Sequence, residues 1–226
     1  MTTVNILSLH KSGSTLQNDI YTYINKIAGQ QIGFSRTKIS WLQVLYLKQE
    51  ELKNADIIVI RNPINRLISH YYSAFCGKNK DDNNVHNFGY HDHQRLIRSR
   101  TLSEWVVRKK FLLKHKNLYD LILDSSNLHI IRYEDMMDHP KKFISFILDK
   151  INRLDLLENV HEKWKDEFVF NMPDLSDKIV NEGLISHRRI LDHNEYLKKF
   201  TKQELEIINS VLGDTLHRYN NIKSFP

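Results

Sequence analysis

Short apolar runs alternate along the chain with segments that have helical spacing. The apolar run Val4 to Leu9 predicts a short buried strand, and the run 55–61, where β-branched residues follow one another without alternation, predicts a second. A third strand is expected over 127–132, again at an apolar run. Strands that alternate with helices favour an α/β fold with a parallel sheet.

The helical segments are recognised by apolar residues three and four positions apart. This spacing predicts amphipathic helices over 16–27, 41–53, 64–75, 143–151 and 205–219. Thr101 and Thr201 each stand three residues before a glutamate, a capping box that starts a helix. The helix after Thr101 is expected to continue through Phe111, and a separate short helix is expected over 118–123. Residues 29–35 are expected to be a break that can hold a short strand, and 152–200 to be irregular.

Length and composition narrow the class of protein. The chain has 226 residues, 41% of them hydrophobic, which is enough for one buried core, so 1–226 is expected to be a single domain. The formal charge of +6 favours acidic ligands, but no block of basic residues appears, and nucleic acid is not an expected partner. Cys76 is the only cysteine, which excludes an intrachain disulfide and fits a reducing compartment. With neither a leader pattern nor an apolar run of membrane-spanning length, the expectation is a soluble cytoplasmic protein.

A polar loop joins the first strand to the first helix. Backbone N–H groups in the first turn of a helix have no intrahelical partner, so this junction favours an anion. Gly13 allows close approach, Lys11 adds a cation, and hydroxyl donors come from Ser12, Ser14 and Thr15. The loop therefore predicts phosphate or sulfate binding, with a ligand-free capped turn as the alternative. It is not a Walker A loop, because its lysine precedes its only glycine.

The second strand ends at Arg61, and Pro63 suits the first turn of the helix that follows. Ligands of open α/β sheets bind at the carboxyl ends of strands, which makes Arg61 a candidate ligand-binding residue. Ser69 lies two turns along the same helix. The alternative for Arg61 is a capping or surface arginine. Glu134 and Asp135, just after the third strand, are either acid/base residues or partners of a cap or a basic neighbour.

The segment 77–100 is long and polar, a type of loop that is often functional. It contains Tyr90, His91 and His93, the candidates for contacts with a substrate. His91 and His93, with His86 and Asp92 nearby, are also weighed as metal ligands, but their spacing does not establish a site and no metal is expected.

Three separated stretches together resemble the sulfotransferases that use 3′-phosphoadenosine 5′-phosphosulfate as donor. The loop 9–15 is similar to the Pro-Lys-Ser-Gly-Thr-Thr loop of that family. The segment 60–72 resembles its second signature, Arg-Asp/Asn-Pro with a serine eight residues after the arginine. The segment 131–136, followed by Pro140, is similar to its Tyr-Glu-Asp-Leu/Met stretch. The resemblance covers 7–150 and implies a P-loop-like three-layer sandwich, a central parallel sheet flanked by helices.

The resemblance also implies roles. Lys11 contacts the bridging oxygen of the phosphosulfate, and residues 12–15 hold the 5′-phosphate. Arg61 and Ser69 hold the 3′-phosphate, and Tyr133 lies near the nucleotide. The late basic residue that folds over the 3′-phosphate is matched by Arg188 or Arg189, although the usual Arg-Lys-Gly-x-x-Gly pattern is absent. The reaction implied is in-line transfer of a sulfuryl group to a hydroxyl or amine of a saccharide, lipid or small metabolite, with no metal and with 3′,5′-adenosine bisphosphate as product.

Two departures from the family pattern leave the general base open. His10 stands at the usual proline, and the interval between the first loop and the second strand has no histidine. Glu50 and Glu51 are the nearest candidates there, and the other candidates are His10, His70, His91 and His93.

The segment around Arg61 looks closer to carbohydrate sulfotransferases, which makes a saccharide the favoured acceptor. Two other functions stay open: a nucleotide kinase or NTPase with an altered P-loop, and a nucleotide-binding module without turnover. Oligomeric state is not predicted.

Overall fold

The computed structural model describes residues 4–9, 12–29, 34–39, 49–73, 100–164 and 195–226. The chain forms two compact units. The sheet unit consists of Met1–Asn62, Lys114–Asn171 and Asp214–Pro226, and the helical unit of Pro63–Leu113 and Met172–Gly213. No helix within the described ranges has the length and apolar character needed to cross a membrane.

The sheet unit is built on four parallel strands, β1 (Val4–Leu9), β2 (Phe34–Ile39), β3 (Ile57–Ile60) and β4 (His129–Arg132). Their order in the sheet is β2-β1-β3-β4. The chain leaves β1 toward β2 and then returns to β3 on the opposite side of β1, so the order reverses between β1 and β3. Open α/β sheets bind ligands at such a switch point, beyond the carboxyl ends of the strands. The loops that follow β1 and β3 are therefore the first place to look for a site.

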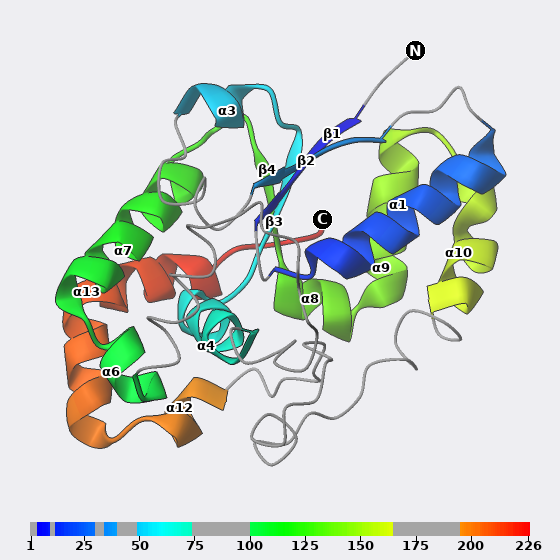
Figure 1. Ribbon diagram of the computed structural model, residues 1–226. Helices are drawn as coiled ribbons and strands as arrows, with labels where there is room; N and C mark the ends of the chain where they lie inside the picture. Colours follow the sequence, from blue (N-terminus) through cyan, green and yellow to red (C-terminus); the bar gives the residue numbers. More distant parts are fainter. Residues whose placement is uncertain (1–3, 10–11, 30–33, 40–48, 74–99, 165–194) are drawn as a thin grey trace, which may run out of the picture. The chain divides into compact units, whose positions relative to one another are not determined.

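Helices cover both faces of this sheet (Figure 1). Leu7, Leu9, Ile58 and Ile60 point to one face, where they pack against Leu118, Tyr119, Ile122 and Tyr219 of two helices, α7 (Lys109–Leu123) and α13 (Lys202–Asn220). Successive strand residues alternate between faces, so Ile6, Ile57 and Val59, all buried, point to the other face. Two helices, α1 (Ser14–Ala28) and α9 (Pro140–Lys150), lie on that side. The predicted α/β fold with a parallel sheet between helical layers is confirmed.

The shorter elements of the sheet unit lie at the ends of the strands and beside α9. They are α3 (Gln49–Lys53), α8 (Tyr133–Asp138), the 3-10 helix η1 (Leu154–Leu156) and α10 (Leu157–Lys163). Helix α8 begins directly after β4, so Tyr133 and Glu134 stand at the carboxyl end of that strand.

The C-terminal residues close the outer edge of β4. The backbone N–H of Arg132 donates to Ser224 Oγ over 2.9 Å, and His129 Nε2 lies 2.8 Å from the Ser224 carbonyl oxygen. Phe225 packs near Phe143 and Phe146, with ring centroids 6.5 and 6.2 Å apart. Covering an edge strand in this way removes a surface that could pair with another chain.

The helical unit contains α4 (Pro63–Ser73), α6 (Leu102–Val106), α12 (Glu195–Lys199) and the adjoining parts of α7 and α13. Trp105 is its buried aromatic centre, with ring centroids 6.2 Å from His70 and 4.7 Å from Phe111. The Tyr71 hydroxyl donates to the Arg100 carbonyl over 2.8 Å. Ser103 Oγ also donates to Glu204.

Several predicted element bounds differ from the structure. A six-residue strand, β2, begins inside the break that was expected to hold a short strand, and it runs on past that break through consecutive polar residues. The helix expected through Phe111 ends at Val106, where the backbone of the C-cap Val107 leaves the helical conformation at φ −76° and ψ 4°, and α7 starts afresh at Lys109 instead of near 118. Helix α10 lies in a stretch expected to be irregular. Both predicted capping boxes are present: Glu104 accepts from the Thr101 N–H and Glu204 from the Thr201 N–H, over 2.8 and 2.7 Å. Whether 1–226 acts as one domain stays a prediction.

Candidate functional site

The loop between β1 and α1 makes a tight turn at a left-handed glycine. Gly13 has φ 73° and ψ 22°, and it is the N-cap of α1. The Ser12 N–H donates to the Leu9 carbonyl over 3.1 Å, and the Gln17 N–H makes a helical bond to the Gly13 carbonyl over 2.9 Å. Gln17 Nε2 braces the turn by donating to the Ser12 carbonyl over 2.7 Å. The turn thus aims the positive end of the α1 dipole at the carboxyl edge of the sheet.

Ser12 carries an unsatisfied polar atom in this turn. Its side chain is fully buried, and its Oγ has no hydrogen-bond partner among the residues that the structure describes. A buried hydroxyl without a partner costs about 1–3 kcal/mol. Such an atom is typical of a position where a ligand supplies the missing hydrogen bond.

Arg61 stands at the carboxyl end of β3, next to the loop of β1 at the switch point of the sheet. Only 4% of its surface is exposed, and its Nε has no hydrogen-bond partner in the described part of the chain. No carboxylate in those ranges forms an ion pair with it. Its guanidinium carbon lies 4.9 Å from the centroid of the Tyr133 ring, a cation–π contact. A buried cation that lacks a counter-charge is costly unless an anion binds there.

Tyr133 links the loop to the arginine. A Cβ added to Gly13 would lie 2.6 Å from Cε2 and 2.8 Å from Cδ2 of the Tyr133 ring. The same ring carries the Arg61 guanidinium. Burial raises the pKa of Tyr133, while the Arg61 charge opposes that shift, so the hydroxyl is neutral at physiological pH. Gly13, Arg61 and Tyr133 each come from one of the three stretches that resemble the sulfotransferases, and they meet at the Tyr133 ring.

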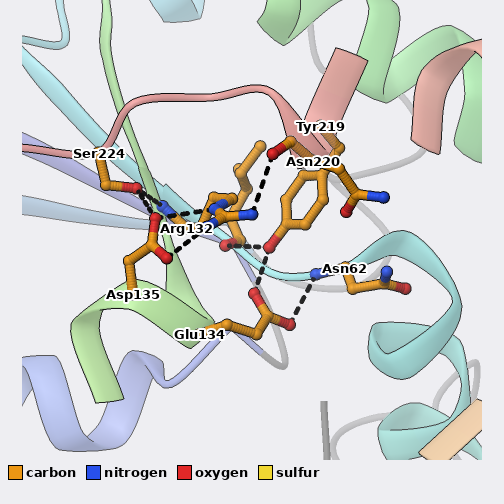
Figure 2. A network of polar contacts seen from close by, with 8 residues as sticks. Asn62, Arg132, Glu134, Asp135, Tyr219, Asn220 and Ser224 are labelled. Carbon is orange, nitrogen blue, oxygen red and sulfur yellow. Dashed lines mark hydrogen bonds and ion pairs between the residues drawn. The ribbon is translucent and has the colours of Figure 1, made fainter. Parts of the chain in front are cut away.

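Glu134, the next residue, ties the end of β3 to the C-terminal part of α13 (Figure 2). Its Oε1 accepts the backbone N–H of Asn62 over 3.1 Å, and its Oε2 accepts the Tyr219 hydroxyl. Burial, followed by the Glu134 charge, raises the pKa of Tyr219 well above 10, so that hydroxyl keeps its proton. Glu134 is thus engaged in structural hydrogen bonds on both oxygens, which favours the partner role over the acid/base role considered from the sequence.

A second polar cluster secures the C-terminal residues, also visible in Figure 2. Arg132 Nε donates to Asp135 Oδ2 over 2.7 Å, and Ser224 Oγ donates to the same oxygen over 2.5 Å. Burial on its own raises the pKa of Asp135, but the hydrogen bonds from Arg132 and Ser224 outweigh it and hold that pKa below its usual value. Asp135 is therefore the partner of a basic neighbour, the second of the alternatives that the sequence left open.

The remaining candidates are only partly described. Ser14 and Thr15 open α1, and their side chains lie outside the described part of the chain. Ser69 is half-buried in α4, in the helical unit, and His70 is buried there. Glu50 is exposed in α3, and the Glu51 side chain in the same helix is not described. The other candidates lie outside the described residues: His10, Lys11, Tyr90, His91, His93, Arg188 and Arg189. Within the described ranges, no three histidine, cysteine or carboxylate side chains gather as a metal site would require.

Two residues of the site region were missed in the sequence. Tyr119 Oη donates to the Arg61 carbonyl over 2.5 Å, and Tyr219 Oη donates to Glu134. In the sequence both tyrosines occupy apolar positions of helical stripes. A buried tyrosine hydroxyl needs a partner, which is the signal that could have marked them.

The fold that carries this arrangement is the P-loop-like fold of sulfotransferases, an α/β fold with a small parallel sheet. Among solved structures, the chain is similar to mouse sulfotransferase SULT7A1, whose crystal structure is complexed with PAP. The two share 12% sequence identity with a TM-score of 0.50, and the alignment covers 96% of this chain and 87% of the mouse chain. No protein-family model matches the sequence, and no curated protein matches it. The likeness establishes the fold.

Proposed function

We propose that this protein is a sulfotransferase that uses 3′-phosphoadenosine 5′-phosphosulfate as donor, with the whole of 1–226 acting as one catalytic domain. The observation that carries the proposal is Arg61, a buried guanidinium without a counter-charge in the described residues, at the switch point of the sheet. An anionic ligand supplies the missing charge. The similar mouse structure is a sulfotransferase complexed with PAP, which supports PAP or its sulfated form as the anionic ligand.

The residues present fit a nucleotide with phosphates at two positions. Ser12, Gly13 and the first turn of α1 offer a hydroxyl and backbone N–H groups to the 5′-phosphate. Arg61 offers a cation to the 3′-phosphate, and we assign Ser69 to the same phosphate from the sequence resemblance. Tyr133 touches both the loop and Arg61, so its ring supports the region between the two phosphates.

The chemistry assigned to the chain is positioning and charge stabilisation. Sulfuryl transfer is an in-line displacement, in which negative charge grows on the leaving oxygen as the bond to sulfur breaks. Lys11 is assigned to that oxygen, beside the helix N-terminus that neutralises the 5′-phosphate. No metal is required in this proposal. His10 is our candidate for the general base near the acceptor. The alternatives for that base are His70, His91, His93, Glu50 and Glu51.

The proposed acceptor is a hydroxyl or amine of a saccharide, lipid or small metabolite, with a saccharide favoured. Tyr90, His91 and His93 are the proposed acceptor contacts, and Arg188 or Arg189 is proposed to cover the 3′-phosphate. We also propose a cytoplasmic location, which rests on the sequence pattern alone.

The proposal is tested by transfer of labelled sulfate from the donor to a panel of glycans, phenols and amines. We expect turnover on glycans, abolished by Lys11→Ala. Turnover on phenols alone would contradict the saccharide preference and leave the enzyme class intact. Nucleotide binding without transfer to any acceptor would favour a non-catalytic module. Equal affinity for ADP and 3′,5′-adenosine bisphosphate would favour the kinase alternative.

A further inference from the structure

The peptide group that joins Arg61 to Asn62 is held from both sides by side chains. Its carbonyl oxygen, on Arg61, accepts the Tyr119 hydroxyl over 2.5 Å. Its N–H, on Asn62, donates to Glu134 over 3.1 Å. Ordinary strand residues use these two groups in the sheet ladder, whereas here they are committed to α7 and α8.

The two hydrogen bonds belong to one buried cluster, and Figure 2 shows the part of it around Asn62, Glu134 and Tyr219. Glu134 accepts Tyr219 on its second oxygen, and the Tyr219 ring meets the Tyr119 ring edge-on with centroids 6.4 Å apart. Tyr119 is 0%, Tyr219 2% and Glu134 8% exposed. Hydrogen bonds in such surroundings are not shared with water, so each of them fixes geometry more firmly than a surface contact does.

A held peptide fixes the direction of its side chain. Because the peptide group is planar, restraining both its carbonyl and its N–H sets its orientation at the Arg61 Cα. Pro63 restrains the other side of this peptide, since proline disfavours the helical conformation at Asn62, the residue before it. The direction of the Arg61 Cα–Cβ bond is therefore set by Tyr119 and Glu134. The residue before Glu134, Tyr133, then supports the guanidinium itself.

We infer that Tyr119, Glu134 and Tyr219 form a peptide clamp that positions Arg61 to select a nucleotide bearing a 3′-phosphate. This inference rests on the proposed function. The three are positioning residues: none of them is placed on the ligand, and they act through the orientation of Arg61. The clamp predicts that nucleotide selectivity can be lost while the nucleotide site itself survives.

The test compares binding of 3′,5′-adenosine bisphosphate and 5′-AMP by calorimetry. The readout is the ratio of the two dissociation constants, which isolates the 3′-phosphate. We expect Tyr119→Phe to reduce the preference by about three- to tenfold, the scale of one lost hydrogen bond, with little change for 5′-AMP. In an Arg61→Met background the same substitution should leave the ratio unchanged, because the group that it positions is gone.

Thr215→Val is the matched control. Thr215 Oγ1 donates to Asp120 Oδ1 over 2.9 Å, so this variant removes a hydrogen bond between the same two helices, α7 and α13, beside the clamp. It should lower stability and keep the wild-type preference. If Tyr119→Phe does not fold, Tyr219→Phe provides the same comparison by freeing one oxygen of Glu134.

The outcomes separate the clamp from the proposed function. A wild-type protein that prefers the 3′-phosphorylated nucleotide, with that preference intact in both tyrosine variants, would overturn the clamp and leave the function standing. An equal loss in Thr215→Val would also overturn it, since the effect would then be general destabilisation. A wild-type protein without the preference would overturn both.

Discussion

Gly13 offers a sharp test of the loop, because one added methyl group meets two separate obstacles. Its φ of 73° is left-handed, a conformation that costs a residue with a Cβ about 1–2 kcal/mol. The new Cβ would also lie 2.6 Å from the Tyr133 ring, and pushing a packed ring aside costs about 1–3 kcal/mol. Gly13→Ala should therefore lower the free energy of unfolding by about 2–5 kcal/mol, or the Tm by about 5–15 °C for a chain of this size.

Gly213→Ala is the matched control for that experiment. Gly213 lies within α13, and a Cβ added there meets no atom within 4 Å. Alanine is the better helix former, so this variant should gain about 0.5–1 kcal/mol. Urea and thermal unfolding of both variants provide the measurement. A Gly13→Ala protein as stable as wild type, next to a stabilised Gly213→Ala protein, would refute the placement of Tyr133 against the loop.

Three further predictions concern charge and the C-terminal residues. Arg61→Met should leave the ligand-free protein as stable as wild type or more so, by up to about 2 kcal/mol in urea unfolding, since it removes a buried cation without a counter-charge among the described residues. A marked loss of stability would reveal a counter-charge. The depressed pKa of Asp135 means that its contribution to stability is present above about pH 4, its unfolded value, and is lost as pH falls through the folded pKa. The stability gap between wild type and Asp135→Asn should therefore narrow in acid, and a gap independent of pH between 2.5 and 7 would contradict the pairing with Arg132. Ser224→Ala should cost about 1–3 kcal/mol in the same assay, by leaving the Arg132 N–H without its acceptor, and unchanged stability would show that the C-terminal residues do not hold β4.

The sequence predicted the parts of the fold whose pattern is local and repeated. β1, β3 and β4 are each centred on a short apolar run, and α1, α4, α9 and α13 carry apolar stripes. β2 was expected only as a short strand within a break, because four of its six residues are consecutive polar residues, and its pairing with β1 is a tertiary property. The interruption between α6 and α7 was missed for a similar reason, since a single backbone turn at Val107 ends a stripe that continues in the sequence.

The site shows the same division between local and tertiary signals. Gly13 and Arg61 could be chosen from the sequence because a loop after a strand and an arginine at a strand end are local features. The Tyr119 hydroxyl approaches the Arg61 carbonyl, 58 residues earlier in the chain. The Tyr219 hydroxyl approaches the Ile60 carbonyl, 159 residues earlier. Locally only their hydroxyls distinguish them from apolar core residues, and the acceptors of those hydroxyls could be identified only once the helices were packed on the sheet.

The central claim is that Arg61 gives this chain a preference for a 3′-phosphorylated adenine nucleotide. Calorimetric titration of 3′,5′-adenosine bisphosphate, with 5′-AMP and ADP as controls, tests it directly on wild type and Arg61→Met. The account predicts a strong preference for the bisphosphate in wild type and its loss in the variant. Equal affinity for the three nucleotides in wild type, or a preference that survives the loss of Arg61, would contradict it.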